Sequence, residues 1–236
     1  MIYSVKYEDF GLRDYKETWN YQEKVFQKII NRKSGDTGGK EGSEGPACGT
    51  LIFVEHPHVY TLGKSGSEDN LLLNFIQLRA KDAGFYRINR GGDITYHGPG
   101  QLVGYPILDL EVIGVSLKDY VHGLEEAVIR TVAGFGISAG RLEGATGVWL
   151  NPDLKARSRK ICAIGIRASR YVTMHGFALN VNTNLEYFSF INPCGFTDKG
   201  VTSMEKELGA SQDIEAVKER MKKNLAEIFN LSLINN

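Results

Sequence analysis

The sequence has 236 residues, of which 42% are hydrophobic, and its 28 lysines and arginines balance 28 aspartates and glutamates. A chain of this length buries one sizeable core, so we expect a single domain over residues 1–236. The zero net charge argues against a nucleic-acid binder, which usually carries a basic excess, and against a membrane-surface protein.

The N-terminus and the cysteines indicate a cytoplasmic protein. Charges stand among the first nine residues, where a signal peptide needs an apolar core, and no run of 18 apolar residues occurs. Cys48, Cys162 and Cys194 form neither a CxxC pair nor a disulfide framework, which fits a reducing compartment.

Apolar periodicity and turn residues predict the first elements of the chain. Residues 1–7 alternate as in a strand, and Asp14 begins a capping box that opens a helix ending near Asn31. Residues 32–49 are rich in glycine and contain too little apolar side chain to pack, which predicts a flexible surface loop. Further elements follow in order: strands at 50–55 and 59–62 joined by a turn at 56–58, and a helix at 71–83 that Gly84 ends.

The stretch from Arg90 to Gln101 separates a strand-like run at 85–89 from another at 102–109. It reads Arg-Gly-Gly-Asp-Ile-Thr-Tyr-His-Gly-Pro-Gly-Gln. Glycine allows positive φ angles and close approach of the backbone to a ligand, and proline fixes a turn. The polar side chains between them supply contacts, so the stretch predicts a binding loop, with a glycine-rich hairpin as the simpler alternative.

The second half of the chain begins with a helix that Ser116 caps and Gly136 ends. Strands are expected at 137–140, 147–150, 160–168 and 171–181, and a final amphipathic helix at 213–229. Strands and helices interleave without regular βαβ alternation. We therefore predict an α+β fold, a mixed β-sheet covered by helices on one side.

Alternation along the strand that begins at Lys160 predicts that Lys160 and Cys162 share one face. A lone lysine at the start of an apolar strand usually has its charge in water. Cys194 lies between proline and glycine in a predicted loop, where a thiol packs poorly, whereas inert cysteines usually lie in apolar strands, as Cys162 does. Cys194 is therefore the best candidate nucleophile in the chain.

The twelve residues from Arg90 to Gln101 closely resemble the signature of the lipoyl(octanoyl) transferases. Residues 160–165, 175–180 and 193–195 resemble three further blocks of that family, and 55–63 resembles its Glu-His-Pro…Tyr-Thr-Leu-Gly strand pair. The resemblance covers most of the chain. It implies the fold shared by lipoate and biotin protein ligases.

The resemblance also implies the chemistry and the site. It implies that Cys194 carries an octanoyl or lipoyl group as a thioester, and that Lys160 lowers the pKa of this cysteine and shuttles a proton. The proximity of these two residues is implied by the resemblance, because their spacing alone does not bring them together. The expected substrate-binding residues are Arg90, Gly91, Gly92, Asp93, Ile94, Thr95, Tyr96, His97, Ala163, Ile164, Gly165, Gly176, Phe177 and Ala178.

The implied partners are octanoyl-acyl carrier protein as donor, and lipoyl domains of 2-oxoacid dehydrogenases and the glycine cleavage H protein as acceptors. No cofactor, metal ion, nucleic acid or membrane is expected. Two alternatives stay open. An ATP-dependent lipoate or biotin ligase would need a nucleotide site and no cysteine nucleophile, and a non-catalytic acyl-carrier-binding module would need no chemistry at all.

Overall fold

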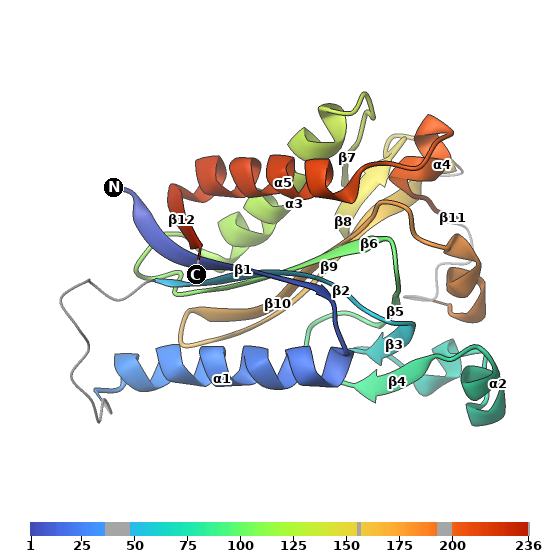
Figure 1. The fold of residues 1–236 in the computed structure, drawn as a ribbon, viewed down its shortest axis with the longest axis horizontal. Coiled ribbons are helices and arrows are strands. Elements are labelled where there is room, and N and C mark those ends of the chain that lie inside the picture. The colour runs from blue at the N-terminus through green and yellow to red at the C-terminus, as the bar shows by residue number, and fades with distance from the viewer. Residues whose placement is uncertain (36–47, 155–156, 193–199, 236) are drawn as a thin grey trace.

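A large twisted sheet runs through the middle of the computed structural model, which describes residues 1–35, 48–154, 157–192 and 200–235 (Figure 1). The strands are β1 (Tyr3–Leu12), β2 (Gly49–Glu55), β3 (Val59–Leu62), β4 (Gly84–Arg87), β5 (Ile94–His97), β6 (Gln101–Leu108), β7 (Gly140–Leu142), β8 (Ala145–Leu150), β9 (Arg159–Ser169), β10 (Val172–Asn180), β11 (Gly200–Val201) and β12 (Leu231–Asn235). The α-helices are α1 (Tyr15–Lys33), α2 (Phe75–Ala80), α3 (Leu117–Ala133), α4 (Met204–Leu208) and α5 (Ile214–Phe229), and two 3-10 helices are η1 (Glu68–Asn70) and η3 (Leu185–Phe190).

The predicted mixed sheet is confirmed. Over the described residues the larger sheet has nine strands in the order β12-β1-β2-β6-β10-β9-β8-β7, with β11 paired to β9. Strand β1 runs parallel to both of its neighbours, β12 and β2. The other pairs along this path are antiparallel. A smaller sheet has the order β4-β3-β5.

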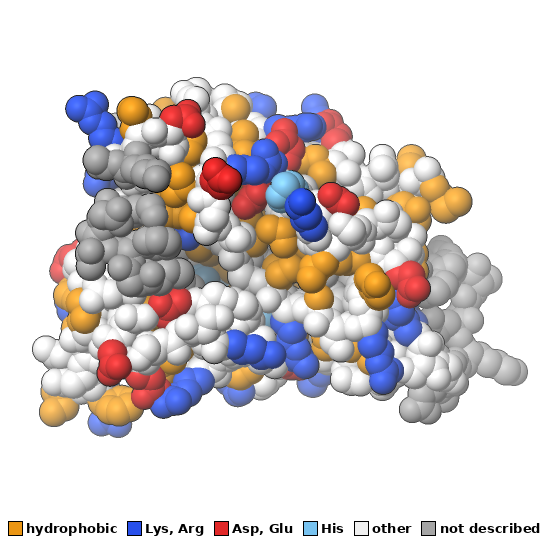
Figure 2. All heavy atoms as spheres, turned by 180° about the vertical axis from the view of Figure 1, so that it is seen from behind, with side chains coloured by type: hydrophobic (Ala, Val, Ile, Leu, Met, Phe, Trp, Pro, Cys, Tyr) orange, Lys and Arg blue, Asp and Glu red, His pale blue; other side chains and the backbone are white. Residues whose placement is uncertain are grey.

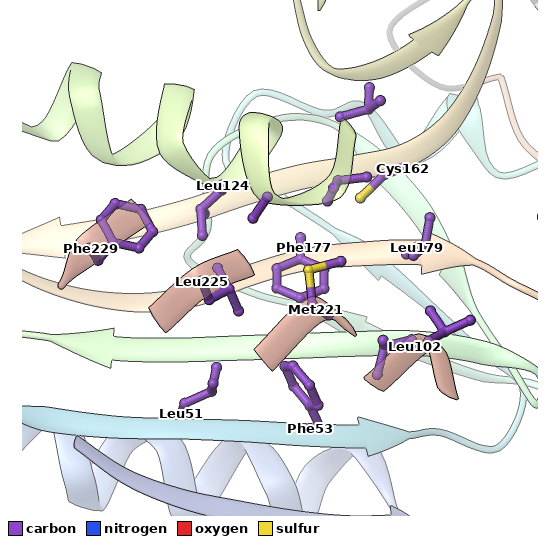
Figure 3. Close-up of a cluster of buried hydrophobic side chains, with 14 of the residues drawn as sticks. Leu51, Phe53, Leu102, Leu124, Cys162, Phe177, Leu179, Met221, Leu225 and Phe229 are labelled. Atoms are coloured by element: carbon purple, nitrogen blue, oxygen red, sulfur yellow. The ribbon is translucent and has the colours of Figure 1, made fainter. Parts of the chain in front are cut away.

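Helices cover both faces of the larger sheet, so the expectation of helices on one side only is wrong. Helix α1 lies on one face, and α3 and α5 lie on the other (Figure 1). Phe26 of α1 packs with Ile52 on the first face, while Leu124 of α3 and Leu225 of α5 pack with Phe53 on the second (Figure 3). Every residue of β6 is buried, as both faces of a central strand must be when each is covered.

The helix predicted at 71–83 is shorter than expected. Asn74 caps α2 with a capping box, so the helix begins only at Phe75. Leu71 makes a β-bridge with Ile191 instead of joining the helix. Gly84 begins β4 rather than ending a helix, because it pairs with Val59 in the smaller sheet. Tertiary pairing thus overrides the local helical pattern.

Other boundaries also differ from the predicted ones. The stretch expected as one loop contains β5, which pairs with β3. Helix α1 extends to Lys33, and α3 ends at Ala133 with Gly134, not Gly136, as its cap. The strand expected at 137–140 begins only at Gly140. Strand β12 was not predicted, and the greater part of the predicted loop at 32–49, residues 36–47, lies outside the described residues.

Acidic and basic side chains are intermixed over the face shown in Figure 2, in keeping with the zero net charge. Ion pairs such as that between Arg141 Nη2 and Glu126 Oε2, at 2.9 Å, join the two kinds of charge. None of the helices described is both long enough and apolar enough to span a membrane.

Candidate active site

A cavity of about 400 Å³ lies where the smaller sheet and the residues around Arg90 meet strands β6, β8, β9 and β10. This volume is in the range of small-molecule sites. The fold brings residues of three separate sequence blocks to its wall. The expected residues that line it are Arg90, Gly92, Asp93, Ile94, Thr95, His97, Lys160, Ala163, Ile164, Gly165, Gly176, Phe177 and Ala178.

Of the expected site residues that the structure describes, Gly91 and Tyr96 are not among those lining the cavity. Gly91 donates its N–H to the carbonyl oxygen of Ile166 at 2.8 Å and so ties the loop to β9. Tyr96 is buried, and its hydroxyl lies 2.7 Å from Nδ1 of His58. These contacts hold the loop in position, although neither residue lies on the wall of the cavity. Cys194, the predicted nucleophile, lies outside the described residues.

Arg90 anchors the loop through its guanidinium, which is buried. Its Nη2 donates to the carbonyl oxygen of Thr61 at 2.7 Å and to the Thr61 hydroxyl at 2.9 Å, and its Nη1 donates to the Gly91 carbonyl at 3.0 Å. A Cβ added at Gly63 would lie 2.8 Å from Nη1 of Arg90, so only glycine leaves room for this arrangement. Arg90 therefore fixes the loop to β3 at the edge of the cavity.

A chain of hydrogen bonds joins the loop to the strand that carries Lys160. Gln101 Nε2 donates to Asn180 Oδ1 at 2.8 Å, and Asn180 Nδ2 donates to the Thr202 carbonyl at 2.9 Å. The Thr202 N–H then donates to the Lys160 carbonyl at 2.9 Å. Gln101 Nε2 also donates to the Tyr96 carbonyl oxygen at 3.2 Å, which orients the amide. Its Oε1 therefore accepts from Nδ1 of His97 at 2.8 Å, and Nε2 of His97 is left as the acceptor nitrogen.

The histidines on the cavity wall are neutral at physiological pH. Burial lowers the pKa of His97 to about 3, with further lowering by His56 and Arg90. Burial, Arg90 and Arg167 together lower the pKa of His175 to about 3. These imidazoles therefore act as hydrogen-bonding groups rather than as cations. His175 also has a φ of 62°, in the left-handed region that a side chain rarely adopts.

Lys160 is half-buried on β9 and lines the cavity. Cys162, two positions later, is fully buried in the core cluster beside α3 (Figure 3). The prediction that these two side chains share a face is therefore wrong. The register of β8 on β9 shifts between Val148 and Trp149, and this irregularity breaks the simple alternation.

The thiols of the two cysteines within the described residues ionise less readily than a free thiol. Burial raises the pKa of the Cys48 thiol to about 11. Burial also raises the pKa of the Cys162 thiol, well above its ordinary value. Neither residue lines the cavity. Among the described residues, no group of three or more His, Cys, Asp or Glu is arranged to hold a metal ion.

Several residues outside the expected set also line the cavity. Tyr15 comes from the first turn of α1 and had no signal in the sequence, because only tertiary packing brings that helix to the site. His175 and Asn180 belong to a block that the sequence had singled out, so their position was a usable signal. The full additional set is Tyr15, Gln101, Val103, Tyr105, Gly144, Ala145, Thr146, Trp149, His175, Asn180, Phe188, Gly200 and Val201.

Solved structures define the fold class. A lipoate protein ligase from Thermoplasma acidophilum superimposes with a TM-score of 0.69 at 13% identity, covering 99% of this chain and 87% of the ligase. A biotin protein ligase from Aquifex aeolicus superimposes with a TM-score of 0.51 at 11% identity, covering 96% and 70% of the two chains. The fold is thus that of the lipoate and biotin protein ligases, as expected.

Sequence comparison gives the family. The lipoyl protein ligase A/B catalytic domain matches residues 14–226. An octanoyltransferase from Flavobacterium johnsoniae is 54% identical over 98% of each chain, and one from Bacteroides fragilis is 58% identical over 92% of this chain and 94% of the relative. The chain belongs to the octanoyltransferases of the lipoyl protein ligase A/B family, which confirms the resemblance seen in its motifs.

Proposed function

We propose that the chain, acting as a single catalytic domain, transfers an octanoyl or lipoyl group from acyl carrier protein to a lysine of a lipoyl domain through a thioester on Cys194. The observation that carries the proposal is the cavity itself. Lys160 shares its wall with the residues of the Arg90 to His97 loop and of β9 and β10. Membership of the octanoyltransferase family supports the acyl group.

The reaction proceeds in two acyl transfers. The Cys194 thiolate attacks the carbonyl carbon of the donor thioester, a new carbon–sulfur bond forms as the old one breaks, and the departing pantetheine thiolate takes a proton from Lys160. The acceptor amine then attacks the enzyme thioester, gives a proton to Lys160 and releases the Cys194 thiolate. Atoms and charges balance without ATP or any redox partner.

The distribution of thiols supports Cys194 as the nucleophile. A free thiol is only about 3% thiolate at pH 7, so acyl transfer through cysteine needs a site that favours the ionised form. Cys48 and Cys162 are in the opposite situation, because burial raises the pKa of each. A cation near the third cysteine, supplied by Lys160, would meet this requirement.

The wall of the cavity suits an acyl chain. Apolar residues from β5, β6 and β10 line it, among them Ile94, Val103 and Ala178. Burial of roughly six methylene groups would contribute about 5 kcal/mol, at about 0.8 kcal/mol each. The thioester end would lie toward Lys160, beside the backbone of Gly165 and of the loop from Arg90.

The partners follow from the same chemistry. The donor is octanoyl-acyl carrier protein, and the acceptors are lipoyl domains of 2-oxoacid dehydrogenases and of the glycine cleavage H protein. We also place the chain in the cytoplasm, because free cysteines such as Cys48 and Cys162 fit a reducing compartment. Lipoate ligases share the fold, which supports acceptors of the lipoyl-domain type.

Intact-protein mass after incubation with octanoyl-acyl carrier protein tests the proposal. We expect one octanoyl adduct, mapped to Cys194 by peptide mass, that disappears when a lipoyl domain is added. Cys194→Ser should abolish the adduct and the transfer, whereas the matched change Cys48→Ala should preserve both. An adduct on Cys162 would refute the assignment, and ATP consumption with free octanoate would favour the ligase alternative.

A further inference from the structure

The ring of Trp149 lies against the ammonium group of Lys160. The Lys160 Nζ is 4.6 Å from the centroid of the Trp149 ring, within the range of a cation–π interaction. The two residues are directly opposite each other on the antiparallel strands β8 and β9. Both also line the cavity, so the contact lies on its wall.

Trp149 is held firmly in this position. Its side chain is buried, with 2% of the residue exposed, and its Nε1 donates to the carbonyl oxygen of Ala145 at 2.9 Å. The hydrogen bond fixes the plane of the indole as well as its location. An indole held this way presents one face to the Lys160 ammonium without losing further conformational entropy.

The backbone beside Trp149 leaves room for the lysine. Gly147 has a φ of 116°, which favours glycine, and a Cβ added there would lie 2.6 Å from the Cys162 carbonyl oxygen and 3.5 Å from Cε of Lys160. The buried carboxylate of Glu125 accepts the Gly147 N–H at 3.0 Å and Nε of Arg141 at 3.0 Å. This anchor from α3 holds the β7–β8 hairpin, and with it Trp149, against β9.

We propose that Trp149 is a positioning residue of the transferase, whose indole face holds the Lys160 ammonium at the cavity wall where the acyl carbonyl reacts. The inference rests on the proposed function for the role of Lys160, but the contact itself does not. An aromatic face attracts a cation and does not attract a neutral amine, so the indole favours the charged form of Lys160 and limits the positions it samples. It acts through Lys160 and touches no reacting atom.

The contact is tested first by NMR, without any activity measurement. The chain is labelled with 13C at lysine Cε, and the Lys160 signal is identified by its loss in Lys160→Ala. In the wild type the ε-methylene protons of Lys160 should be shifted upfield by the ring current of Trp149. Trp149→Phe should keep an upfield shift, and Trp149→Leu should remove it. An unshifted wild-type signal overturns the proposal.

The role is tested by the rate at which octanoyl-acyl carrier protein acylates Cys194. Trp149→Leu should slow this step by about three- to tenfold with little change in KM, whereas Trp149→Phe should stay within about twofold of the wild type. In the Lys160→Ala background, Trp149→Leu should cause no further slowing. Equal slowing in both backgrounds shows a purely structural tryptophan and overturns the proposal.

The two readouts separate the failure of this inference from the failure of the proposed function. A wild-type chain with a shifted Lys160 signal that takes up no acyl group overturns the proposed function and leaves the contact without a catalytic role. A wild-type chain that is acylated while the Trp149→Leu chain is acylated equally fast overturns only the positioning role. Melting temperatures of each variant show that the compared proteins are folded.

Discussion

Lys160 is expected to act on the nucleophile first through its charge. Lys160→Ala should slow alkylation of Cys194 by about tenfold at pH 7, because fewer thiols are ionised, and change it little at pH 10, where the thiol ionises anyway. Lys160→Arg keeps the charge but does not release its proton, so it should restore alkylation more than turnover. Rates with iodoacetamide from pH 6 to 10, with the adduct mapped, provide the measurement.

Equal alkylation rates in the wild type and Lys160→Ala between pH 6 and 9 would remove Lys160 from the site. His97 and His175 line the same cavity and would be the next residues to test as the activating base.

The buried histidines should make the protein less stable in mild acid. The pKa of His97 and that of His175 are each about 3 in the folded chain, below the ordinary value of 6.5. The unfolded chain therefore binds protons that the folded chain does not. The stabilisation is complete above about pH 6.5 and is lost as the pH falls toward 3, by up to about 1.4 kcal/mol per pH unit for each histidine.

Urea unfolding at pH 7, 6 and 5 measures this slope above the range in which ordinary carboxylates titrate. His97→Gln should reduce the slope, and the matched change of the exposed His122 to Gln should not. NMR signals that show neutral imidazole rings for these histidines in the folded protein at pH 5 would support the same conclusion without a substitution. A slope unaffected by His97→Gln would contradict it.

At the scale of residues, the motifs identify much of the cavity wall. Most residues of the loop from Arg90, residues 163–165 of β9 and residues 176–178 of β10 line the cavity. Tyr15 and Trp149 were missed, because each reaches the wall through packing between elements distant in sequence. The face of Cys162 was predicted wrongly, since the irregular β8–β9 register is not visible in the alternation of one strand.

Close contact between β6 and β10 makes one glycine on the cavity wall difficult to replace. A Cβ added at Gly176 would lie 2.2 Å from the Gly104 carbonyl oxygen and 2.8 Å from Cδ of Pro106. Backbone atoms in a central pair of strands do not move aside easily. Gly176→Ala should therefore lower the free energy of unfolding by about 1–3 kcal/mol.

Urea denaturation of Gly176→Ala, and of Gly84→Ala as the matched control, measures the change in the free energy of unfolding. A Cβ at Gly84 would meet its nearest neighbour, Cγ2 of Val59, at 3.5 Å, which is an ordinary contact. Equal stabilities for Gly176→Ala and Gly84→Ala would show that β6 and β10 separate more readily than this geometry indicates.

At the scale of elements, the long helices were predictable and some of the short elements were not. Helices α1, α3 and α5 have capping residues and an apolar stripe that recurs over several turns. Strands β5 and β12 have only four and five residues. Each forms because a strand from another part of the chain pairs with it, and the sequence of a short segment does not show which strand that is.

The glycine-rich segment between α1 and β2 should be dispensable for the molecule as a whole. Its flanks are fixed independently, because Nζ of Lys33 lies 2.7 Å from Oδ1 of Asp109 and the Cys48 N–H donates to the Ser4 carbonyl at 2.8 Å. Changing the length of a long segment between two fixed points costs little closure entropy. Replacing residues 36–47 by a short Gly-Ser linker should leave melting temperature and turnover nearly unchanged.

Differential scanning calorimetry and the transfer assay check this expectation. A fall of more than a few degrees in melting temperature would show that the segment packs on the protein, and a weaker affinity for acyl carrier protein at normal stability would show that it binds the donor.

The position of β1 between β2 and β12 has a consequence for the nascent chain on the ribosome. Tyr3 pairs with Leu231, so β1 receives its outer neighbour from a segment that is synthesised much later. Until Leu231–Asn235 leave the exit tunnel, one side of β1 presents free N–H and C=O groups that another strand can pair with. Emergence of β12, rather than collapse of the core, is then the event that covers β1, and β12 takes its place as the edge strand of the sheet.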